Sequence, residues 1–106
     1  MKKLFEDIRS GASPDFSVLV QALRSTFPLL DRLKDTPQEP AWHAEGDVAI
    51  HTAMVLDELY ADLQQNPVAG SARLVLVLSA LLHDLAKPLT TRRVEIGGVP
   101  RIAAYG

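Results

Sequence analysis

Residues 74–85 read LVLVLSALLHDL, and His83 and Asp84 are the only ionisable groups in this run. The run follows Gly-Ser at positions 70 and 71 and precedes Lys87 and Pro88, which predicts a buried helix over residues 71–86 that Pro88 ends. An unpaired charge in such a helix would be strongly destabilising. His83 and Asp84 therefore need a partner, and a divalent cation is one that imidazole and carboxylate both ligate.

A third candidate ligand, His51, lies in a helix predicted over residues 47–64. Asp47 suits the N-cap of this helix. The inward face then recurs at three-and-four spacing, through Val48, His51, Thr52, Val55, Leu56, Leu59 and Leu63. His51 shares this face with the leucines, so it points toward the helix that carries His83 and Asp84. We expect the three side chains to converge between the two helices.

A histidine near the start of one helix, followed about thirty residues later by a His-Asp doublet, resembles the HD-domain superfamily of metal-dependent phosphohydrolases. The segments WHAEGDV (42–48), HTAMVLD (51–57) and ALLHDLAKP (80–88) look most like the HD domains of bacterial tRNA nucleotidyltransferases and related RNA-processing proteins. The resemblance covers residues 42–106, whereas residues 1–41 carry no recognised motif.

The resemblance implies roles for four side chains in this sequence. His51, His83 and Asp84 match metal ligands, and the metal (Mn, Mg, Ni, Fe or Zn) is not distinguished by the residues. Asp84 is also a candidate to orient the attacking water, and Lys87 matches a lysine that faces a substrate phosphate. Apart from the resemblance, His43 is a candidate outer ligand or substrate contact.

Simpler structural roles fit the same residues. His51 taken alone fits a core histidine, and Lys87 fits a solvated helix end. The doublet fits an ion pair, although an aspartate is unfavourable at the negative end of a helix. His43 fits packing in the loop before the helix, and Asp47 is a helix cap or a support for the ligand one turn later.

One ligand of the family pattern is absent. Family members add an Asp from a later helix, but no Asp or Glu follows Glu95 in this sequence, and residues 101–106 end where the resemblance leads us to expect further helices. We therefore interpret residues 1–106 as a single, truncated or naturally shortened HD domain. Three protein ligands leave positions for water, with reduced metal affinity.

These features favour a metal-dependent phosphohydrolase acting on a phosphomonoester or phosphodiester of a nucleotide or an RNA end. The alternative is a non-catalytic HD-like module that supports an RNA nucleotidyltransferase, kinase or ligase. A third hypothesis is a structural role through homo-oligomerisation, because removal of later helices would leave apolar surface exposed. Metal content separates the first hypothesis from the other two.

Composition excludes several other classes. The chain has no cysteine, so disulfides and thiolate metal sites are excluded. Its net charge is -2, and no basic cluster exceeds pairs such as Lys2-Lys3, so it lacks the electrostatic signature of a strong nucleic-acid binder. No apolar segment is long enough to span a bilayer or resembles a signal peptide, which predicts a cytoplasmic protein without a membrane partner.

The fold class predicted from these patterns is all-α, an HD-like bundle of about five helices with a small C-terminal hairpin. Helices are expected over residues 2–9, 13–23, 27–33, 47–64 and 71–86. In the second of these, Ser13 is the expected cap and Pro14 the first helical residue. Strands over residues 92–96 and 99–103 flank Gly97-Gly98, which is a hairpin signal.

Overall fold

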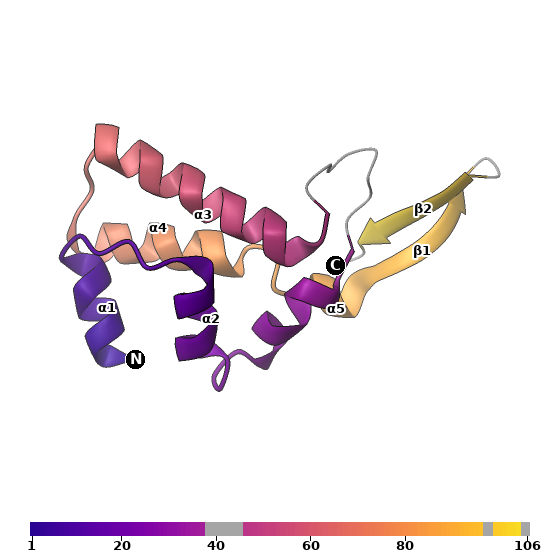
Figure 1. The fold of residues 1–106 in the computed structure, drawn as a ribbon, viewed down its shortest axis with the longest axis horizontal. Helices are drawn as coiled ribbons and strands as arrows, with labels where there is room; N and C mark the ends of the chain where they lie inside the picture. Colours follow the sequence, from indigo (N-terminus) through magenta and orange to yellow (C-terminus); the bar gives the residue numbers. More distant parts are fainter. Residues whose placement is uncertain (38–45, 97–98, 105–106) are drawn as a thin grey trace.

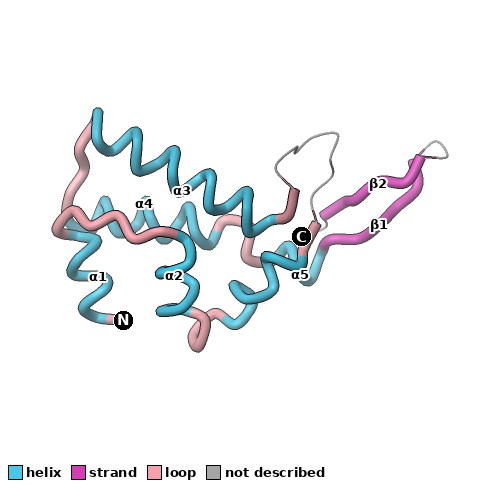
Figure 2. Tube along the Cα trace, viewed as in Figure 1, coloured by secondary structure: helices cyan, strands magenta, loops and turns pink. Residues whose placement is uncertain are grey.

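The computed structural model of the protein describes residues 1–37, 46–96 and 99–104. These residues form helical segments followed by one hairpin (Figures 1 and 2), in the order α1 (Lys2–Arg9), α2 (Phe16–Leu23), η1 (Pro28–Asp35), α3 (Val48–Gln65), α4 (Gly70–Leu82), α5 (Lys87–Thr90), β1 (Thr91–Ile96) and β2 (Val99–Ala104). The segment η1 is a 3-10 helix. The predicted class, a helical bundle with a C-terminal hairpin, is confirmed.

The long helices α3 and α4 run antiparallel and contact each other, because a short connection joins them (Figure 1). Helix α1 also packs on α4, and α2 and η1 pack on α3. The core between them is aliphatic, as the composition indicates, and its largest fully buried side chains are Ile8, Leu19, Leu23, Leu30, Leu33, Leu56 and Leu81. None of the described helices is both long enough and apolar enough to cross a membrane.

The hairpin projects from the helical bundle next to α5 (Figure 1). Strands β1 and β2 pair antiparallel, with Thr91 opposite Ala104 and Ile96 opposite Val99. This register agrees with the turn predicted at Gly97-Gly98, two residues that lie outside the described part of the chain.

Helix α3 begins as predicted. The carboxylate of Asp47 accepts a hydrogen bond from the backbone N–H of Ile50 at 2.8 Å, which confirms Asp47 as the N-cap. The predicted inward face is also confirmed, since Val48, Thr52, Leu56 and Leu63 are buried and His51 is partly buried.

The predicted start of α2 is wrong. Its N-cap is Asp15, whose carboxylate accepts the N–H of Val18 and the hydroxyl of Ser17, both at 2.9 Å. The bond from Val18 is the main cause of a lowered pKa for Asp15. Ser13 does not cap the helix, because its hydroxyl accepts a bond from Arg73 on α4, a contact that sequence spacing does not reveal.

The predicted end of α4 is also wrong. The helix stops at Leu82, and a turn with 3-10-type bonds follows, from the N–H of Leu85 to the carbonyl of Leu82 and from that of Lys87 to Asp84. Pro88 lies inside α5 and does not end α4. The doublet therefore lies in a turn after the apolar helix.

Helix α4 is not buried on every side. Its inner face carries Leu74, Val77 and Leu81, which pack in the core, whereas Val75 is 60% exposed and Leu76 is 40% exposed. The expectation of a fully buried helix fails because, among the described elements, α4 packs chiefly on α1 and α3, and these two helices leave Val75 and Leu76 uncovered.

The α1–α2 loop is tied to α3 by Tyr60, whose hydroxyl donates a hydrogen bond to the carbonyl of Pro14. Burial raises the pKa of Tyr60 to about 12. At neutral pH the change Tyr60→Phe is expected to lower the free energy of unfolding by about 1 kcal/mol, because this bond is lost.

The pH dependence of this contribution has a definite sign. The pKa of Tyr60 is raised from 10.0 to about 12 in the fold, so the unfolded chain loses the proton first. The stabilisation is complete below pH 10 and is lost as the pH rises toward 12. Denaturant unfolding at several pH values should show the gap between wild type and Tyr60→Phe shrinking across this interval, and a constant gap would contradict the assignment.

Candidate metal centre

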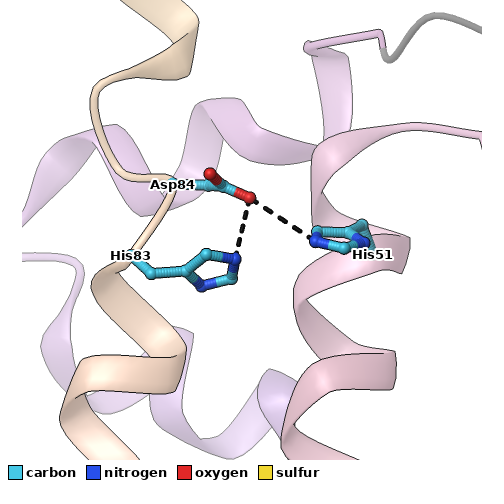
Figure 3. Close-up of side chains that lie close together, drawn as sticks. All are labelled: His51, His83 and Asp84. Atoms are coloured by element: carbon cyan, nitrogen blue, oxygen red, sulfur yellow. Dashed lines mark ion pairs between the residues drawn. The ribbon is translucent and has the colours of Figure 1, made fainter. Parts of the chain in front are cut away.

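Three side chains from two distant segments converge at one end of the α3–α4 pair. His51 lies in the first turn of α3, and His83 and Asp84 lie in the turn directly after α4 (Figure 3). Because the two helices are antiparallel, the start of α3 lies beside the end of α4. One ligand atom from each residue lies within 4.8 Å of the other two. The predicted convergence is therefore observed.

Asp84 is at the centre of the group. Its Oδ2 atom lies 2.9 Å from His83 Nε2 and 3.6 Å from His51 Nε2. A cation with bonds of about 2.1 Å holds neighbouring ligand atoms about 3.0–3.5 Å apart. Both distances are close to that range, and a separation of up to 4.8 Å for the widest pair requires a modest side-chain rotation. The donor set thus fits a borderline or hard divalent ion.

The ring of His83 is oriented by the backbone. Its Nδ1 atom lies 2.6 Å from the carbonyl oxygen of Ala80, and a carbonyl only accepts, so Nδ1 carries the hydrogen. The other nitrogen, Nε2, faces Asp84. This arrangement, one ring nitrogen on a carbonyl and the other toward the ion, is typical of metal-bound histidines. Sequence reasoning missed Ala80, because the carbonyl is available only where α4 ends.

The three side chains differ in exposure. Exposed fractions are 14% for Asp84, 20% for His51 and 36% for His83. His83 is therefore not the buried side chain that the apolar run predicts. Partial exposure instead leaves one side of the cluster open to solvent, which a substrate or water would need.

Lys87 lies on the other side of the carboxylate. Its Nζ atom is 3.4 Å from Asp84 Oδ1, so the two carboxylate oxygens face different partners. Lys87 belongs to α5, and α5 contacts η1, where the Arg32 guanidinium donates to the Pro88 carbonyl at 3.5 Å. No motif indicated Arg32, because only the tertiary structure brings η1 to α5.

The two remaining candidates are His43 and Asp47. His43 lies outside the described residues. Asp47 caps α3, and its backbone carbonyl accepts the N–H of His51 at 3.1 Å, so it holds the first turn that positions His51. No further His, Asp or Glu within residues 1–37 and 46–89 joins the three ligands.

The sequence of this chain is similar to part of several bacterial Multifunctional CCA proteins. The Multifunctional CCA protein of Methylococcus capsulatus is 46% identical over 69 residues, which are 65% of the chain and 14% of that protein. The one from Shewanella frigidimarina is 41% identical over 88 residues, 79% of the chain and 19% of that protein. The one from Actinobacillus pleuropneumoniae is 37% identical over 83 residues, 74% of the chain and 19% of that protein.

The chain therefore spans less than a fifth of the length of these relatives. No protein-family model matches the chain. No solved structure matches it either.

Proposed function

We propose that this chain is an HD-type helical module of an RNA-processing nucleotidyltransferase and that His51, His83 and Asp84 hold a divalent cation. Similarity to Multifunctional CCA proteins over most of the chain supports the first part. The observation that carries the second part is the convergence of the three ligand atoms within 4.8 Å, with Nε2 of His83 turned toward Asp84.

Calorimetric titration with Mn²⁺ tests the metal centre directly. One equivalent should bind, because the three ligands form one group. In NMR spectra, paramagnetic Mn²⁺ should broaden the ring signals of His51 and His83 first. Binding without broadening at these rings, or no binding, would contradict the assignment.

The chemistry of the cluster follows from its ligands. When bound, a divalent ion polarises a phosphoryl oxygen and lowers the pKa of a coordinated water. His51 and His83 leave the ion's charge intact because they bind as neutral rings, and Asp84 offsets part of it. The Lys87 ammonium, 3.4 Å from Asp84, is close enough to the cluster to neutralise charge on a phosphate placed there.

A second candidate function is hydrolysis of a phosphomonoester or phosphodiester at this centre. The position of Lys87 favours hydrolysis, because a purely structural ion does not require a nearby cationic side chain that can contact a substrate phosphate. The competing hypothesis is a module that holds the ion for a structural role without turnover, which metal content alone does not separate from a hydrolase. Hydrolysis of p-nitrophenyl phosphate and bis(p-nitrophenyl) phosphate at saturating Mn²⁺ separates the two.

Weak, metal-dependent turnover is expected, and Lys87→Met should lower it by about tenfold to a hundredfold through loss of one charge-assisted contact. Binding of Mn²⁺ should persist in this variant. Lys2→Met, an equal change at an exposed position of α1, is the matched control. Saturated metal without turnover in the wild-type chain would exclude the hydrolase and leave the non-catalytic module.

A further inference from the structure

A second candidate site lies between α2 and η1, and it shares no residue with the metal cluster. It is a pocket of about 280 Å³, close to the lower end of small-molecule sites, which start at about 300 Å³. Its lining has an apolar floor and a polar rim. The floor is formed by Phe16, Val20, Leu30 and Ala49. The rim is formed by Ser17, Gln21, Arg24, Asp31 and Lys34.

The floor is a continuation of the core. Leu30 and Ala49 are buried, and Phe16 and Val20 pack against the core while one side of each remains at the pocket. Phe16 thus presents an aromatic ring to the cavity. An aromatic ring at an apolar floor is a stacking surface for a flat, unsaturated ligand, and stacking of a base on an aromatic side chain contributes about 1–3 kcal/mol.

The rim carries two cations, Arg24 and Lys34. Both are exposed, and within the described part of the chain neither side chain has a hydrogen bond or ion pair. The side chains of Gln21 and Asp31 are likewise without partners among the described residues. Two cations, one acid and one amide around an aromatic floor match a ligand that combines a negative group with a flat ring bearing donors and acceptors.

We propose that this pocket binds one nucleotide. The base lies on Phe16, its polar edge faces Gln21 and Asp31, and its phosphate lies on Arg24 and Lys34. The same chemistry is offered by a free nucleoside monophosphate and by one unit of an RNA strand.

Other occupants fit less well. An inorganic anion would use the two cations and leave the aromatic floor empty. A purely apolar ligand would sit better in the groove along α4, which is lined by Val75, Leu78, Ser79, Leu82 and His83 and has no lysine or arginine. The combination of floor and rim therefore selects a phosphorylated aromatic compound.

Amide NMR titrations of the intact chain with adenosine 5′-monophosphate, adenosine and inorganic phosphate test the proposal. The monophosphate should shift amides of α2 and η1, and adenosine and phosphate should each bind about tenfold or more weakly, because each uses only half of the pocket. Shifts confined to His51, His83 and Asp84, or phosphate binding as tight as that of the nucleotide, would overturn the nucleotide assignment. The proposed metal centre would be unaffected by either result.

Substitutions at the pocket test where the ligand binds. Arg24→Gln combined with Lys34→Gln should weaken binding of the monophosphate by about tenfold or more. The double change Lys2→Gln with Arg9→Gln on α1, which alters the net charge equally, should leave binding unchanged. Phe16→Leu should weaken binding of the nucleotide and leave binding of inorganic phosphate unchanged. An equal loss of affinity in both double variants would mean that binding depends on net charge alone, and it would overturn the proposal that this pocket is the binding site.

A titration with a short single-stranded RNA shows whether the pocket takes a free nucleotide or one unit of an RNA strand. If the pocket takes one unit of a strand, the RNA should bind more tightly than the monophosphate and shift the same amides. If the pocket takes a free nucleotide, the RNA should bind no better. Circular dichroism of each variant confirms that folding is kept, which is expected for the exposed Arg24 and Lys34.

Discussion

Asp84→Asn should weaken Mn²⁺ binding by about a hundredfold or more, the largest functional effect expected for any single change in this chain. The carboxylate is the only negative group of the cluster, and its Oδ2 atom is the one that both histidines face, at 2.9 and 3.6 Å. An amide keeps the shape and removes the charge. Two neutral imidazoles then remain, which hold a divalent ion poorly.

Calorimetry with Mn²⁺ measures this loss, and Asp57→Asn is the matched control because Asp57 is exposed on α3, away from the cluster. His83→Ala should also reduce binding, since it removes one ligand. Any hydrolysis should disappear in both the Asp84 and the His83 variants. Turnover that survives both changes would show that the doublet is structural and that the metal assignment is wrong.

Arg73→Met is expected to produce the largest loss of stability. The Arg73 side chain reaches from α4 into the α1–α2 loop, where one guanidinium nitrogen contacts the carbonyls of Gly11 and Ala12 at 3.1 and 3.0 Å and the hydroxyl of Ser13 at 2.9 Å. The residue is only 6% exposed, so water cannot replace these bonds in the folded state. Methionine fills the space and leaves the two carbonyls and the hydroxyl without this donor.

The expected loss is about 3 kcal/mol of unfolding free energy, and roughly 10–20 °C in melting temperature for a domain of this size. Part of it is offset because the Nε atom of Arg73 is itself buried without a partner in the described structure. Thermal unfolding by circular dichroism measures the change. Arg9→Met, an equal change at an exposed position of α1, should alter the melting temperature little. A melting temperature for Arg73→Met close to that of this control would mean that the loop does not depend on the contact.

The convergence of His51, His83 and Asp84 was predictable because local rules decide most of it. The three-and-four spacing from Val48 to Leu63 places His51 on the inner edge of α3. A connection of a few residues between α3 and α4 forces the two helices to be antiparallel, so the start of one meets the end of the other. Both conditions can be read from residues close together in the chain.

The details around the doublet were not predictable in the same way. Apolar periodicity continues to Leu85, but α4 ends at Leu82, where the His83 imidazole binds the Ala80 carbonyl. In a continuing helix that carbonyl would accept the N–H of residue 84. A side chain thus competes with the backbone for one acceptor, and periodicity carries no information about that competition.

The sequence by itself determined the helical class, the hairpin, the cap of α3 by Asp47 and the meeting of His51 with His83 and Asp84. These follow from hydrophobic period, turn residues and short connections, which act over a few residues. Only the tertiary structure decided that Asp15 caps α2, that Arg73 holds the α1–α2 loop, that Arg32 contacts α5, and that a charged pocket opens between α2 and η1. Each of these joins side chains to groups brought close by packing, and such pairings depend on the assembled geometry and not on spacing along the chain.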